Sequence, residues 1–298
     1  MSLYLGIDGG GTKTKFLLGD DRNVLAEATA AGSNVLRSGE AAVRETLTAG
    51  VREVCANGGV EGSEVARTVA GIAGSSNRQV HDTLVAILRE VVGGEVLVVG
   101  DMVVAHHAAL EGQPGILVNA GTGSIAYGRN AAGETARAGG WGFAISDEGS
   151  GHWIGRVAVA SAMRCFDTGK ELGFLHHLMA ALKVEEPQDL ARFANSTANP
   201  DFAKVFPAVV LLADQGDVTA HKILQHAGEE LACLCEAVQS RIFGAEDATL
   251  VAAAGGVFRN STAVFESFQR TLHEHSPKAE VFIADGEPVD GALELARG

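Results

Sequence analysis

Apolar runs of strand length and longer helical patterns alternate along the chain, and breaks rich in glycine and polar residues separate them. The run at residues 3–7 predicts a strand, residues 15–19 predict a second strand, and residues 24–30 predict a third. Asp8 and the glycine-dense segment 9–14 lie between the first two strands. The opening pattern therefore predicts a β-hairpin with an unusually glycine-rich bend.

The rest of the pattern predicts an α/β protein in which the opening hairpin recurs. Further strands are expected at residues 67–72, 96–99, 116–119, 125–128, 134–138, 249–254 and 281–284. Helices are expected at residues 40–55, 80–92, 102–111, 218–242, 261–275 and 289–296, with a helical region from residue 151 that breaks near residues 169, 187, 199–200 and 216. Residues 116–128 repeat the strand, glycine bend and strand of the opening, which predicts two related domains facing each other across a cleft.

Composition narrows the class of protein. The chain has 298 residues, of which 46% are hydrophobic, and a formal net charge of −14. This acidic balance, with no basic block, argues against nucleic acid or an anionic membrane as a partner. No apolar run approaches the length of a membrane span and the N-terminus has no export signal, so we expect a cytoplasmic protein.

The four cysteines are scattered along the chain, at positions 55, 165, 233 and 235. Cys233 and Cys235 are two positions apart in an expected helix, so they should point to different faces and form a poor clasp for a metal or cluster. We expect all four to be buried small hydrophobic groups or free thiols.

The first glycine bend has the groups that a polyphosphate needs. A simple turn needs fewer glycines, so their excess indicates that something approaches the main chain closely. Converging N–H groups, hydroxyls and an ammonium can form an anion site, and the segment supplies them from Gly10, Gly11, Thr12, Lys13 and Thr14. Asp8 is placed to hold Mg²⁺ through water. The alternative is a glycine-rich hairpin with no ligand; the segment is neither a Walker loop nor a dinucleotide-binding fingerprint.

Each of the other candidate residues has a structural alternative. Asp101 joins a strand to a helix and can be a helix N-cap, and Asp147 also precedes a helix. Residues 139–142 can form a tight loop around a core indole, and Asn34 can be a turn residue. Together, however, two phosphate-type hairpins, a third glycine turn at 255–258 and strand-end carboxylates are the parts of a phosphoryl-transfer site. Such a site also needs one general base for the attacking hydroxyl.

These motifs resemble those of a known superfamily. Residues 8–14, 119–124 and 255–256 are similar to the phosphate-one, phosphate-two and adenosine motifs of the actin/hexokinase/Hsp70 ATPases. Within it, residues 140–142 and 147–150, followed by Trp153, resemble the N-acetylglucosamine kinase branch of the BadF/BadG/BcrA/BcrD ATPase family. The resemblance implies two RNase-H-like (actin-like ATPase) domains with a nucleotide and sugar cleft between them. It implies residues 1–113 plus 288–298 for the N-terminal domain, and residues 114–287, with a helical insertion, for the C-terminal one.

The resemblance also implies a role for each matching position. Asp101 falls where these kinases place the base that deprotonates the sugar hydroxyl. Sugar contacts are expected at Asn34, Gly74, Ser75, Gly140, Trp141, Gly142 and Asp147. Contacts to ATP, with Mg²⁺ held by Asp8 through water, are expected at Asp8, Gly10, Gly11, Thr12, Lys13, Thr14, Gly121, Thr122, Gly123, Ala203, Gly255, Gly256 and Asn260.

The expected function is the ATP-dependent phosphorylation of an amino sugar, with N-acetylglucosamine and its 6-hydroxyl first in order. Glucosamine and N-acetylmuramate are alternative substrates, because the sequence does not fix the group at C2. A different class of function is an ATP-driven activator that acts on a protein partner, as in the iron-sulfur members of the same family; the scattered cysteines weaken it. We also expect a homodimer, for which the apolar helices between residues 151 and 242 offer surface.

Overall fold

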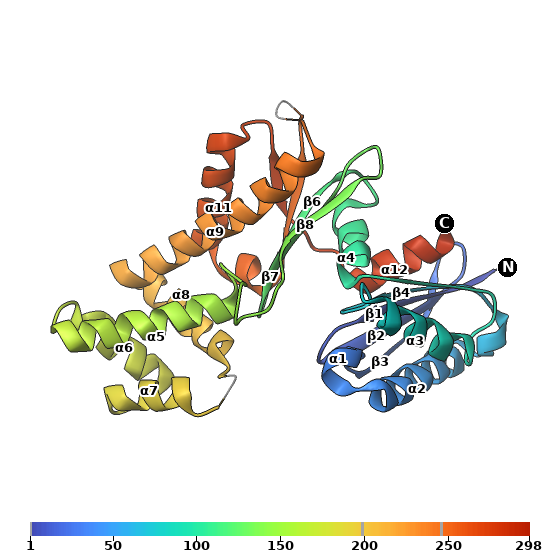
Figure 1. The fold of residues 1–298 in the computed structure, drawn as a ribbon, viewed down its shortest axis with the longest axis horizontal. Coiled ribbons are helices and arrows are strands. Elements are labelled where there is room, and N and C mark those ends of the chain that lie inside the picture. Colours follow the sequence, from blue (N-terminus) through green and yellow to red (C-terminus); the bar gives the residue numbers. More distant parts are fainter. Residues whose placement is uncertain (1, 198–199, 245–246) are drawn as a thin grey trace. The chain divides into compact units, whose positions relative to one another are not determined.

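The computed structural model describes residues 2–197, 200–244 and 247–298, and the chain divides into two compact units (Figure 1). Unit 1 comprises the chain up to Gln113 together with Asp285–Gly298, and unit 2 is Pro114–Ala284. The sequence predicts a return to the first domain at residue 288, and the structural division comes three residues earlier. Of the helix break expected at residues 199–200, Asn199 lies outside the described residues.

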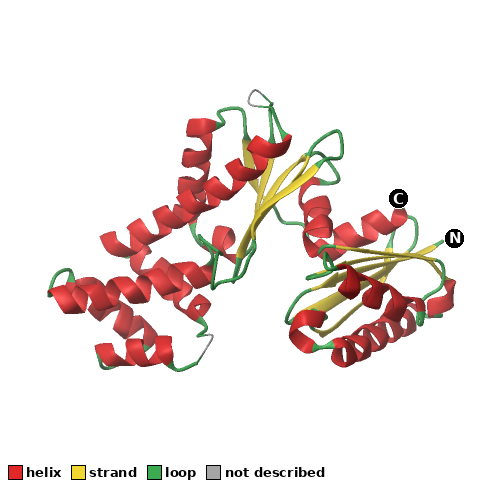
Figure 2. Ribbon diagram, viewed as in Figure 1, coloured by secondary structure: helices red, strands yellow, loops and turns green. Residues whose placement is uncertain are grey.

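Unit 1 is built on a five-stranded mixed sheet in the order β3-β2-β1-β4-β5 (Figure 2). Its strands are β1 Leu3–Gly9, β2 Lys13–Gly19, β3 Val24–Ala31, β4 Val65–Ile72 and β5 Glu95–Val99. The first two form the predicted hairpin, whereas β1, β4 and β5 run parallel. The carboxyl ends of these three strands therefore meet at one edge of the sheet, where ligands of open α/β sheets commonly bind.

Helices cover both faces of this sheet. They are α1 Val35–Ser38, α2 Glu40–Gly58, α3 Arg78–Arg89, α4 Asp101–Leu110 and α12 Pro288–Arg297, with a 3₁₀ turn at Gly62–Glu64. One core lies between the sheet and α2 and α3, and it includes Leu5, Ile7 and Phe16. The opposite face packs on α4 and α12, because side chains of a strand alternate between the two faces.

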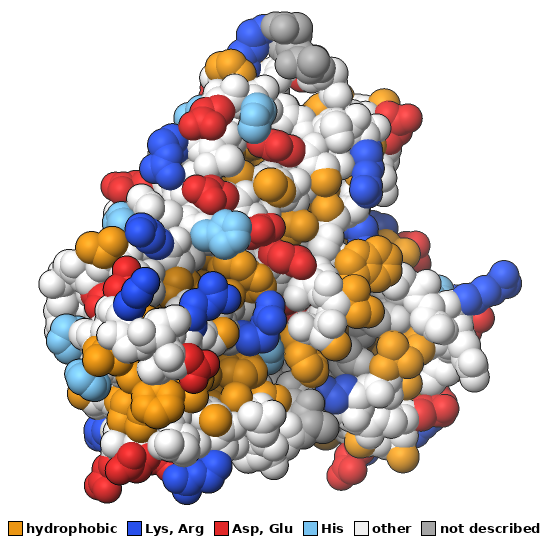
Figure 3. Space-filling view, turned by 60° about the vertical axis from the view of Figure 1, so that its left-hand side comes forward, with side chains coloured by type: hydrophobic (Ala, Val, Ile, Leu, Met, Phe, Trp, Pro, Cys, Tyr) orange, Lys and Arg blue, Asp and Glu red, His pale blue; other side chains and the backbone are white. Residues whose placement is uncertain are grey.

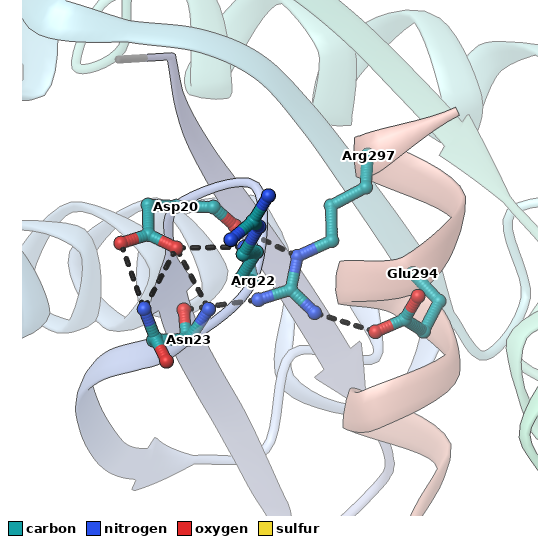
Figure 4. Close-up of polar contacts among 5 residues, drawn as sticks. All are labelled: Asp20, Arg22, Asn23, Glu294 and Arg297. Carbon is teal, nitrogen blue, oxygen red and sulfur yellow. Dashed lines mark hydrogen bonds and ion pairs between the residues drawn. The ribbon is translucent and has the colours of Figure 1, made fainter.

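The C-terminal helix α12 is an integral part of unit 1. A Cβ at Gly6 of β1 would stand 2.4 Å from the Leu293 backbone nitrogen, so β1 and α12 touch main chain to main chain. Arg297 then fixes the end of the helix to the turn after β2: its Nε donates to the Asp20 carbonyl at 2.8 Å and its Nη2 to the Asn23 carbonyl at 2.9 Å (Figure 4).

Unit 2 repeats the same sheet topology in the order β10-β9-β6-β7-β8. Its strands are β6 Gly115–Ala120, β7 Ser124–Arg129, β8 Thr135–Gly139, β9 Leu250–Ala254 and β10 Glu280–Ile283. As in unit 1, the first three strands are antiparallel neighbours and β6, β9 and β10 run parallel. The internal repeat expected from the two glycine hairpins is thereby confirmed.

The helices of unit 2 share one large core with its sheet. They are α5 Gly151–Thr168, α6 Leu172–Leu182, α7 Pro187–Asn195, α8 Phe206–Asp214, α9 Val218–Ile242, α10 Gly256–Asn260 and α11 Thr262–His275, with a 3₁₀ turn at Phe202–Val205. The long helix α9 packs on the sheet with one face and on α8 and α11 with others. The face drawn in Figure 3 shows hydrophobic side chains in patches between charged groups of both signs.

One local expectation about the elements was wrong. Residues 255–258 do not form a glycine turn: Gly255 has φ +95° and precedes the short helix α10. Its Cβ would stand 2.3 Å from the Ala120 carbonyl oxygen, so glycine is needed for the close approach of α10 to β6. The short helix α1 is not among the expected elements; it begins after Asn34, whose side chain accepts from the Arg37 N–H.

The described helices include none that is both long and apolar enough to cross a bilayer. The four cysteines are free and all lie on helices. Cys235 is buried and Cys233 is exposed, which confirms that the pair points to different faces of α9.

Candidate functional site

The first glycine bend is held in shape by the segment that follows β3. The Gly10 N–H donates to the Lys13 carbonyl at 3.0 Å, and the Ser33 N–H donates to the Gly10 carbonyl at 3.0 Å. The Thr14 hydroxyl is fully buried and donates to the Ala31 carbonyl at 2.7 Å. Thr14 therefore supports the bend from inside, whereas Thr12 and Lys13 form its exposed rim and Gly11 is half-buried.

Two carboxylates meet beside this bend at the carboxyl ends of parallel strands. Asp8 is the second-last residue of β1, and Asp101 follows β5 by two positions and begins α4. The pKa of Asp8 is raised to about 6, chiefly by burial and next by the negative charge of Asp101, against the opposing effect of Lys15. The structure thus brings the expected Mg²⁺ residue and the expected base into electrostatic contact.

The unit 1 residues expected to hold the sugar gather at the same sheet edge. The Asn34 amide lies beside Gly74, whose Cβ would stand 3.7 Å from Asn34 Oδ1. Ser75 is buried next to it and donates to the Val99 carbonyl at 2.7 Å, just ahead of Asp101. Asn34, Gly74, Ser75 and Asp101 therefore lie near one another at this edge of the unit 1 sheet.

The donor set beside the bend fits Mg²⁺ held through water better than a metal held by protein alone. Within residues 2–197, 200–244 and 247–298, no group of three or more His, Cys, Asp or Glu side chains is placed to hold an ion. Mg²⁺ in phosphoryl-transfer sites keeps several waters and takes one or two carboxylates, and the remaining ligands come from the phosphates. Asp8 meets that requirement, and a cation there would also offset the repulsion between Asp8 and Asp101.

In unit 2, the second glycine bend, helix α5 and Asp147 form one hydrogen-bonded assembly. The Gly121 carbonyl accepts from the Gly151 N–H at 2.8 Å, so the first turn of α5 rests on the bend. The Ser124 N–H donates to Asp147 Oδ1 at 3.2 Å, and a Cβ at Gly123 would stand 3.0 Å from both carboxylate oxygens. Asp147 is buried with φ +71°, and burial raises the pKa of its carboxyl.

The loop at residues 140–142 joins the same assembly. The Gly140 N–H donates to the Ser124 carbonyl at 2.9 Å, and Gly140 and Gly142 both have positive φ. Trp141 is not a core indole: its side chain is 65% exposed, and the Arg137 guanidinium carbon lies 4.3 Å from its ring centroid. A large, exposed aromatic ring on a loop anchored through glycine can pack on a ligand.

A cavity of about 580 Å³ opens beside the second bend within unit 2. Five residues expected at the nucleotide line it, namely Gly121, Thr122, Ala203, Gly256 and Asn260. The Asn260 side chain stabilises the short helix α10, because its Nδ2 donates to the Gly256 carbonyl at 2.7 Å. Gly255 supports the wall from behind through its contact with β6.

The sequence reasoning missed the other half of this lining, which consists of Gly151, Phe206, Pro207, Val210 and Val257. These residues come from α5, α8 and α10, and most of them are apolar, as in typical pockets for flat ligands. Their type suits a buried core equally well. No local signal distinguishes a core side chain from one that borders a cavity.

Comparison with known proteins places the chain in a family. The sequence profile of the BadF/BadG/BcrA/BcrD ATPase family matches residues 5–296. The chain belongs to this family. It is 30% identical over 302 residues to an N-acetylmuramic acid/N-acetylglucosamine kinase of Clostridium acetobutylicum, covering 100% of this chain and 99% of that protein.

Two further relatives support the same placement of this BadF/BadG/BcrA/BcrD family member. An N-acetyl-D-glucosamine kinase of Dictyostelium discoideum is 26% identical over 310 residues, covering 99% of this chain and 97% of that protein. A solved structure of a candidate N-acetylglucosamine kinase from Chromobacterium violaceum superimposes with a TM-score of 0.79 at 26% identity, covering 99% of each chain. The family and the fold expected from the motifs are thereby confirmed.

Proposed function

We propose that this protein is an ATP-dependent kinase of N-acetylated amino sugars that phosphorylates N-acetylglucosamine on its 6-hydroxyl. The names of its full-length relatives support this class of substrate, and N-acetylmuramate is the second candidate because one of them is named for both sugars. Glucosamine is the third, since it lacks the acetyl group that both names share.

The observation that carries the proposal is the position of Asp101 beside Asp8 and the first glycine bend. Asp101 accepts the Met102 N–H at 3.1 Å, which orients its carboxylate at the start of α4. In this role the carboxylate takes the proton of the attacking sugar hydroxyl as the hydroxyl oxygen bonds to the terminal phosphorus and ADP leaves. Little other covalent chemistry falls to the protein, because positioning and charge neutralisation supply most of the rate.

The nucleotide is assigned to the glycine bends and to the cavity of unit 2. Its adenosine fits the apolar wall of Phe206, Pro207 and Val210, with Ala203, Gly255, Gly256 and Asn260 at the border. Gly121, Thr122 and Gly123 are assigned to the phosphates in unit 2, and Gly10, Gly11, Thr12 and Lys13 in unit 1. Asp8 is proposed to hold Mg²⁺ through water, and the ion supplies the charge that offsets the phosphate oxygens.

The sugar is assigned to two groups of residues. In unit 1 these are Asn34, Gly74 and Ser75, next to Asp101. In unit 2 they are the loop Gly140, Trp141 and Gly142 together with Asp147, which the Ser124 N–H fixes in place.

A coupled assay of ADP release tests this function. The purified protein should turn over MgATP with N-acetylglucosamine or N-acetylmuramate, more slowly with glucosamine, and little with N-acetylmannosamine or without sugar. The position of the new phosphate follows from NMR of the product, which should carry it on C6. If no sugar raises ADP release above the sugar-free rate, the kinase assignment is wrong.

The activator ATPase is a weaker alternative for this chain. Such proteins bind an iron-sulfur cluster through paired cysteines, whereas the four cysteines of this chain lie on helices. Cys233 and Cys235 are closest in sequence, and Cys235 is buried in the core of unit 2. Iron-dependent absorbance in the pure protein, or ATP hydrolysis that ignores every sugar, would favour it. A homodimer and a cytoplasmic location stay predictions, and light scattering of the purified protein tests the first.

A further inference from the structure

Arg37 covers the first glycine bend. Measured from the point at which a Cβ of Gly11 would stand, Arg37 Nη1 lies at 3.0 Å, Cδ at 3.5 Å and Cζ at 3.9 Å. The guanidinium thus occupies the space that any side chain at residue 11 would fill. A side chain at residue 11 would crowd Arg37, which is a second reason for glycine at this position in addition to the turn.

The short helix α1 fixes Arg37 in this position from its main chain. The Arg37 N–H bonds to the Asn34 carbonyl at 3.1 Å and to Asn34 Oδ1 at 3.3 Å. In the segment just before α1, Gly32 packs directly on the bend. A Cβ at Gly32 would stand 2.5 Å from the Gly11 carbonyl oxygen and 2.8 Å from the Thr12 nitrogen. The segment that carries Arg37 is therefore built onto the bend and does not swing free of it.

No acidic side chain in the described parts of unit 1 pairs with the positive charge of Arg37. Its side chain has no ion-pair or hydrogen-bond partner among them, although the chain carries 37 acidic against 23 basic residues. The charges that shift the pKa of Asp8 come from Asp101, Lys15, Glu287 and Lys13, so Arg37 does not serve to neutralise that carboxylate either. An exposed guanidinium above a bend of main-chain N–H groups is a ready contact for an anion.

We propose that Arg37 binds the terminal phosphate of the nucleotide, the group that is transferred. This inference rests on the proposed function for the presence of ATP at the bend. Arg37 is assigned to the terminal phosphate because Asp101, the proposed base, lies in the same unit. The sugar hydroxyl that Asp101 deprotonates attacks this phosphate, so Asp101 and the transferred group must lie close together. Arg37 makes and breaks no bond in the reaction; it stabilises the charge on the oxygens of the phosphoryl group.

Titration calorimetry in the presence of Mg²⁺ tests the contact directly, with AMP-PNP and ADP as the two ligands. The variant Arg37→Gln should weaken AMP-PNP binding about tenfold and leave ADP binding within about twofold, because only AMP-PNP carries the third (γ) phosphate, the counterpart of the group transferred from ATP. Arg37→Lys should recover part of the loss, since it keeps the charge but not the fork of donors. Arg52→Gln is the matched control, because Arg52 is also exposed and without a partner in the described structure but lies on α2 away from the bend.

The outcomes separate this inference from the proposed function. Equal weakening of both ligands, or of neither, overturns the role of Arg37 at the terminal phosphate. If the wild type phosphorylates sugar and Arg37→Gln keeps its AMP-PNP affinity and its kcat, the inference alone is wrong. If the wild type binds AMP-PNP but phosphorylates no sugar, the proposed function is wrong, and the comparison of AMP-PNP with ADP still decides the contact.

Discussion

At the scale of single residues, the ionised carboxylate of Asp8 carries a free-energy cost in the folded protein. Its pKa is about 6 because it is largely buried and faces Asp101, whereas an unfolded chain would restore the ordinary value of 3.8. The folded protein therefore binds more protons than the unfolded chain between these two values. It follows that the Asp8 carboxyl favours folding most at low pH and that this contribution is lost as the pH rises through about 6, by up to about 3 kcal/mol.

We predict that Asp8→Asn stabilises the ligand-free protein at pH 8 and abolishes tight binding of the magnesium nucleotide. The amide removes the buried charge and also the ligand for the cation. Urea unfolding at pH 8 and pH 4 measures the first effect, and the gain should shrink towards pH 4, where the Asp8 carboxyl of the folded wild type is already neutral.

Asp167→Asn is the control for that experiment, because Asp167 is exposed on α5 and its substitution changes no buried charge. A wild type that is more stable than Asp8→Asn at pH 8 would contradict the argument from burial.

Asp101 allows a second prediction at this scale. Asp101→Asn keeps an oxygen to accept the Met102 N–H, so the start of α4 should persist, but it removes the proton acceptor. We expect kcat for sugar phosphorylation to fall by about 10²–10⁴, with nucleotide affinity retained.

The same variant should lower the pKa of Asp8, because the Asp101 charge is one of the causes that raise it. NMR titration of the Asp8 carboxyl measures this shift. Near-normal turnover of Asp101→Asn would remove Asp101 from the role of base.

At the scale of elements, helix α12 depends on a contact that only glycine allows. A Cβ at Gly6 would stand 2.4 Å from the backbone nitrogen and 2.8 Å from the Cα of Leu293, and main-chain atoms cannot turn aside as a side chain can. The Arg297 hydrogen bonds to the turn at residues 20–23 then hold the far end of the helix (Figure 4). Sheet and helix are thus joined at the middle of α12 and at its C-terminal end.

We predict that Gly6→Ala destabilises the protein by about 3 kcal/mol, because β1 and α12 must move apart. Gly173→Ala is the matched control: Gly173 lies in helix α6 with nothing within 4 Å of its Cβ position, so alanine there should be neutral or stabilise by up to about 1 kcal/mol. Urea midpoints of both variants measure the difference. Equal stability of the two variants would mean that the close contact between β1 and α12 is not required.

At the scale of the whole molecule, the chain makes two cores, and the last segment belongs to the first of them. Val289, Ala292, Leu293 and Ala296 of α12 are buried against the sheet of unit 1. Without them the α12 face of that sheet would expose Val69 and Leu17 to water.

We therefore predict that a fragment of residues 1–113 does not fold cooperatively, whereas the same fragment joined through a flexible linker to residues 285–298 does. Thermal unfolding followed by circular dichroism distinguishes them: a sigmoidal transition is expected for the second fragment and none for the first. A cooperative transition in residues 1–113 alone would show that α12 is dispensable.

Much of the fold was predictable because it follows from local patterns. The alternation of apolar residues located the strands, and the recurrence of a glycine bend between two strands indicated the repeat. The sequence pattern missed α1 and predicted a turn in place of α10. Both helices are short, and a side-chain cap in one case and a close main-chain approach in the other decide their conformation. The approach of α10 to β6 joins residues that are distant in the chain, which a local pattern does not encode.

The sequence by itself determined the family, the positions of Asp8, Asp101 and Asp147, and the two glycine bends, because strand periodicity and motif spacing are written along the chain. Only the tertiary structure decided that Trp141 is exposed under Arg137, that apolar residues of α8 wall a cavity, and that Arg37 lies on Gly11. These features depend on which distant segments pack together. Packing follows from the shape and burial of a whole unit, and the same side chain can serve a core or a site according to what lies beside it.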